Sequence, residues 1–291
     1  MIYDTIVSRT PIGKGWSGDQ KYLASTADGA AYLLRISPVE KLERRRRTFA
    51  LMQRVYALNV SMCAPVECGL SGEGAYVLLG WIEGEEAETA VPKLSLAQQY
   101  ACGREAGRIL SMIHTLPAPE TQEDWEPRFN RKIDRNIRMY LECGAPRENA
   151  AKFIDYINAN RQLLKNRPQS FQHGDYHIGN MLLDRAGRLT VIDFDRDDFG
   201  DPYEEFNRIV WCAHASPRFA SGMVDGYFGE PVPMDFWRLL ALYVFSNQLS
   251  SVPWAMQFGE DEVATMQKQA REVLAWYDNL QNPVPNWYAS K

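Results

Sequence analysis

No apolar run in the chain approaches the ~20 residues that a helix needs to cross a bilayer. The N-terminus, Met1-Ile2-Tyr3-Asp4, lacks the basic and apolar regions of a signal peptide. Cysteine is scarce: the five residues, an odd number without a C-x-x-C pair, fit neither a disulfide framework nor a structural zinc site. No internal repeat or low-complexity tract is visible. We therefore expect neither export nor membrane spanning, and we predict a cytoplasmic protein.

The composition is that of an ordinary globular protein, with 45% hydrophobic, 12% aromatic and 24% charged residues. It excludes disorder, collagen and coiled coil. Basic residues outnumber acidic ones 10 to 8 up to Gly84, and acidic residues outnumber basic ones 29 to 22 after it. The second part would repel nucleic acid. The run Arg44–Arg47 is short, isolated and without interleaved aromatic residues, so we interpret it as a solvated helix face.

The part of the chain up to Gly84 is predicted to form a small antiparallel sheet with one helix. Apolar segments at 6–7, 21–24 and 31–36 are separated by a glycine-rich segment and an Asp28-Gly29 turn, and 76–82 restores strand character. Between them, residues 38–58 carry apolar side chains at helical spacing.

Helical patterns dominate beyond Gly84. Residues 106, 109, 110 and 113 form an apolar stripe with Ser95 as a candidate N-cap, residues 266–277 form another stripe, and residues 236–245 are apolar enough for a buried helix. One strand-like island, residues 180–194, interrupts this pattern.

That island has the pattern of a β-hairpin, because apolar segments 181–184 and 189–192 flank a glycine-containing turn. Antiparallel pairing would return Asn180 and Asp193 to the same end of the hairpin, and Asp175 lies five residues before Asn180. Hard oxygen ligands of this kind suit Mg²⁺, which leaves other positions to phosphates and water. Asp175 would then be free to orient a hydroxyl and accept its proton, as phosphoryl transfer requires.

The motifs together resemble a known family. His173-Gly174-Asp175-Tyr176-His177-Ile178-Gly179-Asn180, followed by Val191-Ile192-Asp193-Phe194-Asp195 and Gly200-Asp201-Pro202, looks like an aminoglycoside phosphotransferase, a protein-kinase-like small-molecule kinase. The similarity extends over most of the chain. It implies an α+β, two-lobe fold: a nucleotide-binding lobe over 1–84 with a small antiparallel sheet and one helix, and a larger, mainly helical catalytic and substrate-binding lobe over 85–291.

Roles follow from this resemblance for residues that match its motifs. Asp175 would be the catalytic base, and Asn180 and Asp193 would hold Mg²⁺. Backbone groups at the hinge strand would meet the base of the nucleotide, either ATP or GTP; these residues are Gly80, Trp81 and Ile82.

Two further residues match positions that support the loop that carries Asp175. His173 would orient the loop, and Asp201 would hold it around Asp175 without touching substrate. Three acids follow the metal ligand closely enough to line the cleft and bind a cationic acceptor: Asp195, Asp197 and Asp198.

A glycine-rich segment matches G-x-G-x-x-G, a string that dinucleotide-binding folds also use before a helix. Here a strand and the Asp28-Gly29 turn follow, so the segment is predicted to be a hairpin loop over phosphates, as in kinases. The residues assigned to nucleotide binding there are Gly13, Gly15, Ser17 and Gly18.

The strand position that usually holds lysine is Arg35, which can also bridge phosphate oxygens. Thr48 stands where a kinase helix would supply the glutamate that pairs with this cation. The acidic partner of Arg35 is Glu43 or Glu40, or it is absent.

The acceptor is predicted to be a small molecule. Gly174 replaces the arginine of protein kinases, no A-P-E motif follows, and the segment from Asp193 to Gly200 is short, which leaves no platform for a peptide. A cationic molecule such as an aminoglycoside is favoured, which would make the protein an antibiotic-resistance enzyme. A macrolide, a choline-like amino alcohol or a sugar amine is the alternative, and a non-catalytic nucleotide-binding pseudokinase is a further one. Neither nucleic acid nor membrane is expected as a partner, and a monomer is plausible.

Overall fold

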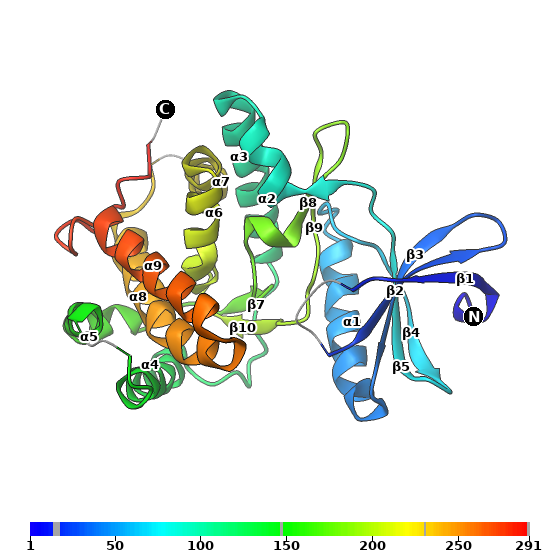
Figure 1. Cartoon of the computed structure of the whole chain (residues 1–291), viewed down its shortest axis with the longest axis horizontal. Helices are drawn as coiled ribbons and strands as arrows, with labels where there is room; N and C mark the ends of the chain where they lie inside the picture. Colours follow the sequence, from blue (N-terminus) through cyan, green and yellow to red (C-terminus); the bar gives the residue numbers. More distant parts are fainter. Residues whose placement is uncertain (14–17, 146–147, 230, 290–291) are drawn as a thin grey trace. The chain divides into compact units, whose positions relative to one another are not determined.

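The computed structural model describes residues 1–13, 18–145, 148–229 and 231–289 (Figure 1). Contacts divide the chain into two compact units. The sheet unit comprises Met1–Ala87 and Asn180–Asp197, and the helical unit comprises Glu88–Gly179 and Asp198–Lys291. The boundary falls just after Gly84, at Ala87, and the predicted hairpin, although distant in sequence, groups with the N-terminal residues.

The sheet unit is built on five antiparallel strands in the order β1-β2-β3-β5-β4. Their bounds are β1 Ile6–Pro11, β2 Gln20–Thr26, β3 Ala31–Ser37, β4 Pro65–Ser71 and β5 Gly74–Gly80. The predicted turn joins β2 to β3, with Gly29 at φ +85° in the left-handed region that favours glycine. One face of the sheet buries Ala24, Leu34, Ile36, Tyr76 and Leu78. The predicted antiparallel sheet is confirmed.

One long helix, α1 (Leu42–Tyr56), packs on β4 and β5 and buries Leu51, Met52 and Val55 against them. Short 3-10 turns, η1 Tyr3–Thr5 and η2 Val39–Lys41, precede β1 and α1. The hairpin consists of β8 (Met181–Leu183) and β9 (Leu189–Val191), which pair antiparallel, and β6 (Glu85–Glu86) pairs with β8. The predicted hairpin is therefore confirmed.

The helical unit contains eight α-helices among its described residues, the first of which begins at the last residue of the sheet unit. They are α2 Ala87–Ala90, α3 Leu96–Ile113, α4 Trp125–Glu142, α5 Glu148–Asn160, α6 Ile209–Ala215, α7 Pro217–Phe228, α8 Met234–Ala255 and α9 Glu260–Trp276. Strands β7 (Ser170–Gln172) and β10 (Asp198–Gly200) pair antiparallel. Short 3-10 helices link these elements: η3 Val91–Lys93, η4 Arg161–Leu164, η5 Ile178–Asn180, η6 Glu204–Arg208 and η7 Met256–Phe258.

Helix α8 is the centre of the helical unit. It buries side chains around its whole circumference, as its apolar sequence predicts, and α4, α5, α9 and η6 pack against it. Its Tyr243 hydroxyl accepts from Trp125 Nε1 at 2.9 Å and donates to Asp201 at 2.6 Å. Through Asp201, this core fixes the segment that follows β10.

Helix α3 begins and packs as predicted. Ser95 and Gln98 form a reciprocal capping box at its N-terminus. The apolar stripe from Ala106 to Ile113 is fully buried, and α3 lies beside α7 in backbone contact at glycines (Figure 1). The Ala106 carbonyl accepts a 2.7 Å hydrogen bond from the hydroxyl of Tyr176, which lies one residue after Asp175. Among the described residues, no helix combines the length and apolarity required to cross a membrane.

Candidate active site

The glycine-rich segment connects two antiparallel strands. Strand β1 ends at Pro11 and β2 begins at Gln20, so Gly13 and Gly18 lie in a hairpin connection, as predicted. Gly15 and Ser17 lie outside the described residues.

At the end of β5, Gly80 N donates to the Ala64 carbonyl at 2.8 Å and Trp81 N donates to the Ala31 carbonyl at 3.1 Å. Both amide hydrogens are therefore used in backbone hydrogen bonds of the sheet unit. The contact of Gly80, Trp81 and Ile82 with a nucleotide base stays a prediction.

Arg35 on β3 is buried and has three acidic partners. Its Nη1 lies 3.1 Å from Asp193 Oδ1, its Nη2 lies 3.0 Å from Asp19 Oδ2, and Nη2 also contacts Asp195. Glu43 instead accepts from Arg46, and Glu40 is exposed. The predicted partners Glu40 and Glu43 are therefore wrong, because acids from before β2 and after β9 reach Arg35 instead.

The arginine run is only partly a solvated face. Arg46 and Arg47 are exposed, whereas Arg45 is 7% exposed, donates to Ser37 Oγ at 3.0 Å and contacts both Asp19 and Asp195. Our interpretation of the run was wrong for Arg45. Its place on the same helix face as the buried Thr48, Met52 and Val55 is the periodic signal that could have identified it.

Asp19 has a lowered pKa. Burial alone would raise its pKa, but Arg45, the Ser37 hydroxyl and Arg35 favour the carboxylate and bring the pKa down to about 2 from 3.8. A carboxyl group whose pKa is lower in the folded state than in the unfolded state stabilises the fold at pH values above its unfolded-state pKa. That contribution is lost as the pH falls through the folded-state pKa.

We therefore expect the Asp19 carboxylate to remain ionised until the pH falls to about 2. The stability it contributes would be lost between about pH 4 and pH 2. Carbon-detected NMR titration of the carboxyl groups, with Asp19→Asn used to assign the resonance, measures this directly. An Asp19 midpoint at the ordinary value of 3.8 would contradict the ion-pair account.

The hairpin returns Asn180 and Asp193 to one end, as predicted. Ile192 N donates to the Asn180 carbonyl at 3.0 Å, and Met181 pairs with Val191. Asp193 has φ +66°, and its side chain is 39% exposed. Within the described ranges, no three His, Cys, Asp or Glu side chains form a cluster that could hold a metal ion. An amide and an accessible carboxylate fit Mg²⁺, which needs only one or two protein ligands when phosphates and water supply the rest.

Two of the three acids predicted to line the acceptor site are engaged with α1. Asp195 contacts Arg35 and Arg45, and Asp197, with a side chain only 2% exposed, accepts from Thr48 Oγ1 at 2.6 Å and pairs with Arg47. These contacts satisfy the charges of Asp195 and Asp197 and argue against a role for either as an acceptor ligand.

Asp198 differs from those two acids. It lies in the helical unit, where its side chain is 59% exposed, and it pairs with Arg128 at 3.3 Å. It remains a candidate for contact with an acceptor.

The loop of the candidate base follows β7. Gly174 has φ +81°, and the Asp175 amide donates to His173 Nδ1 at 3.3 Å. The Asp175 carboxylate lies 3.1 Å from Arg208 Nε and 3.7 Å from His177 Nε2. The buried His173 ring thus holds the backbone of the loop, and the Arg208 guanidinium lies beside the Asp175 carboxylate.

Asp201 does not contact this loop through its carboxylate. It forms a two-point ion pair with Arg167, at 2.6 and 3.0 Å, and accepts from the Tyr203 amide and the Tyr243 hydroxyl. The Gly174 amide instead donates to Glu205, at 3.0 Å to Oε1 and 3.3 Å to Oε2. The role predicted for Asp201 thus belongs to Glu205, because Asp201 stands before η6 and faces Arg167.

Glu205 was missed from the sequence, where it is one of two adjacent acids in a turn. It is buried, and His114 approaches it with Nε2 3.8 Å from Oε2, while His114 Nδ1 bonds the Tyr227 hydroxyl at 2.8 Å. Glu205→Gln should lower kcat about tenfold to a hundredfold, the effect of weakening a hydrogen bond to a charged group, with the nucleotide KM unchanged.

Glu204→Gln is the matched control, since Glu204 pairs with Lys132 and Gln172. It should change thermal stability and leave kcat unchanged. Wild-type kcat in a folded Glu205→Gln enzyme would contradict the positioning role of Glu205.

Several solved structures that are similar to this chain are aminoglycoside phosphotransferases. The apo form of a thermostable mutant of aminoglycoside phosphotransferase APH(4)-Ia matches with a TM-score of 0.68 and 15% identity, over 94% of this chain and 96% of that chain. A GDP complex of an aminoglycoside 2'-phosphotransferase-IIIa variant matches with a TM-score of 0.71 and 14% identity, over 96% and 94%. The gentamicin complex of APH(2")-IIa matches with a TM-score of 0.63 and 15% identity, over 93% and 95%.

This likeness shows that the fold is that of the aminoglycoside kinases, as the sequence motifs predicted. Residues 8–237 match the phosphotransferase enzyme family, and the chain belongs to this family. No curated protein sequence matches the chain.

Proposed function

We propose that the protein transfers the γ-phosphate of a nucleoside triphosphate to a hydroxyl group of a small molecule. The contact between Arg35 Nη1 and Asp193 Oδ1 carries this proposal. It joins a cation suited to phosphate oxygens with a carboxylate suited to Mg²⁺, at the end of the hairpin where Asn180 also lies.

The proposed chemistry divides between residues of the two units. In the helical unit, Asp175 accepts the proton of the acceptor hydroxyl, while Arg208 lies beside its carboxylate and Glu205 holds the preceding amide. In the sheet unit, Arg35 binds phosphate oxygens. Mg²⁺, held by Asn180 and Asp193, would neutralise charge that develops on the β- and γ-phosphates.

The acceptor in this proposal is cationic, with an aminoglycoside as the first candidate. The excess of acidic residues after Gly84 supports it, because an acidic surface concentrates cations. The neighbouring structures, which include a gentamicin complex, supply the first candidates to assay. Those neighbours were also solved with ADP and GDP, so both ATP and GTP belong in the assay. The cytoplasmic location is part of the same proposal.

Asp193→Ala tests the metal and nucleotide half of the proposal. We expect it to abolish Mg²⁺-dependent binding of a non-hydrolysable nucleotide, because a Mg²⁺ ion bound there would lose its carboxylate ligand. Isothermal titration with and without Mg²⁺ measures the effect. Glu43→Gln, an 84%-exposed acid of the same unit, is the control and should bind as the wild type does. Unchanged Mg²⁺-dependent affinity in Asp193→Ala would reject the proposal.

A further inference from the structure

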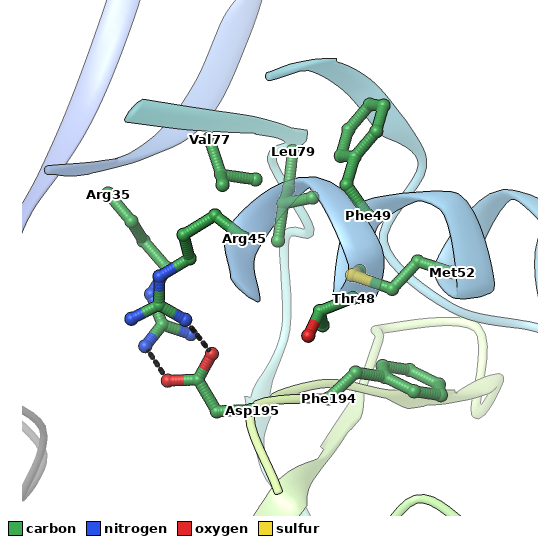
Figure 2. A pocket seen from close by; sticks show the side chains of 9 residues that line it. All are labelled: Arg35, Arg45, Thr48, Phe49, Met52, Val77, Leu79, Phe194 and Asp195. Atoms are coloured by element: carbon green, nitrogen blue, oxygen red, sulfur yellow. Dashed lines mark hydrogen bonds and ion pairs between the residues drawn. The ribbon is translucent and has the colours of Figure 1, made fainter. Parts of the chain in front are cut away.

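Two arginines and two aspartates form a closed ring of ion pairs in the sheet unit. Arg35 Nη2 lies 3.0 Å from Asp19 Oδ2 and also contacts Asp195. Arg45 contacts the same two carboxylates. Figure 2 shows Asp195 between the guanidinium groups, with Oδ2 facing Arg35 and Oδ1 facing Arg45.

The ring is balanced in charge and shielded from water. Both arginines are less than a tenth exposed, and a guanidinium cannot lose its proton, so each needs a carboxylate partner. The ring borders a cavity of about 20 Å³ whose apolar lining includes Phe49, Met52 and Phe194 (Figure 2).

The charges are arranged differently from those of a protein kinase, in which the strand supplies the cation and the helix supplies the acid. Here the strand and the helix each supply a cation, Arg35 and Arg45. The acids come from outside both elements: Asp19 directly follows Gly18, and Asp195 lies two residues after Asp193. The ring thereby joins the end of the glycine-rich segment, β3, α1 and the segment that carries the metal ligand.

We propose that Arg45 positions Arg35 for the nucleotide phosphates by neutralising Asp19 and Asp195. With Arg45 in place, both carboxylates are shared between two guanidinium groups, Lys41 also lies 3.3 Å from Asp19 Oδ1, and Arg35 retains positive charge for phosphate oxygens. Without Arg45, the Asp195 carboxylate pairs with Arg35 alone and Asp19 keeps only Arg35 and Lys41, so the surplus negative charge repels a polyanionic ligand. Arg45 and Asp195 are therefore positioning residues for the nucleotide, an inference that rests on the proposed function.

The test is a double-mutant cycle on Arg45 and Asp195, read out as affinity for a non-hydrolysable nucleotide with Mg²⁺. Arg45→Gln should weaken binding about tenfold or more, a loss on the scale of one charge-assisted contact. Adding Asp195→Asn to Arg45→Gln should restore part of that affinity, because it removes the unbalanced carboxylate. Arg45→Lys, which keeps the charge without the two-point fork, should bind with intermediate affinity.

Arg46→Gln is the matched control from the same run, since Arg46 is exposed and pairs with Glu43. It should bind nucleotide as the wild type does. Thermal unfolding of every variant establishes folding, and Arg45→Lys provides the test if Arg45→Gln does not fold. Wild-type affinity in Arg45→Lys would then overturn the inference.

Two other results would overturn the inference. One is wild-type affinity in a folded Arg45→Gln protein. The other is a double variant that binds more weakly than Arg45→Gln alone, as expected if Asp195 were a metal or acceptor ligand. If Asp193→Ala loses binding while Arg45→Gln does not, the inference fails and the proposed function stands. If the wild type binds no nucleotide, both fail.

Discussion

Replacement of Asp175 by asparagine lowers kcat by about 10²- to 10⁴-fold, the range that a positioned general base contributes. Asparagine keeps the shape of the side chain and cannot accept the proton of the acceptor hydroxyl. The predicted nucleotide ligands lie in the sheet unit, so nucleotide affinity should stay within about twofold of wild type. Steady-state kinetics and isothermal titration on the same preparation separate the two effects.

Asp134→Asn is the control for that substitution. Asp134 lies on α4 of the same unit, with a 67%-exposed side chain paired to Arg161. Its replacement should leave turnover at the wild-type value, since exposed ion pairs contribute little. Equal turnover in wild type and Asp175→Asn would remove Asp175 from the role of base.

Replacement of Gly107 by alanine should destabilise the helical unit by about 3 kcal/mol or more. A Cβ at this position would lie 2.1 Å from the Met223 carbonyl oxygen and 2.6 Å from the Tyr227 amide nitrogen. Both are backbone atoms of α7 and cannot rotate away. The same contact recurs at Gly103, whose Cβ would lie 2.0 Å from the Phe219 oxygen, and from the α7 side at Gly222 and Gly226.

The expected shift in Tm for Gly107→Ala is a fall of about 10 °C, on the usual conversion for a unit of this size. Differential scanning calorimetry measures it. Arg108→Ala, one residue along α3 at an exposed position, is the matched control and should unfold close to the wild-type temperature. A Tm within about 2 °C of wild type for Gly107→Ala would mean that α3 and α7 are not in backbone contact.

The parts of the fold that the sequence predicted are those specified locally. The Ser95 cap, the Asp28-Gly29 turn and the β8–β9 hairpin each depend on residues within a few positions of one another. The family motifs around Asp175 are also contiguous. Local signals of this kind need no knowledge of the tertiary structure.

The corrected interpretations concern contacts between distant residues. Among the partners of Arg35, Asp19 precedes β2, whereas Asp193 and Asp195 follow β9 in the second half of the chain. No periodic pattern in the sequence links these segments to one another. Glu205 lies 31 residues from the Gly174 amide that it holds, and nothing in its local sequence distinguishes it from Glu204. The glycines of α3 and α7 have a visible spacing, but only the packing of the two helices explains it.

The most direct test of the central claim is transfer of a labelled γ-phosphate. Purified protein with Mg²⁺ and γ-labelled ATP or GTP would be offered aminoglycosides, macrolides and amino alcohols, with mass spectrometry of each acceptor. The account predicts that at least one acceptor stimulates nucleotide consumption, gains one phosphoryl group on a hydroxyl, and loses that gain with Asp175→Asn. Nucleotide consumption that no acceptor raises above the level of Asp175→Asn would contradict it.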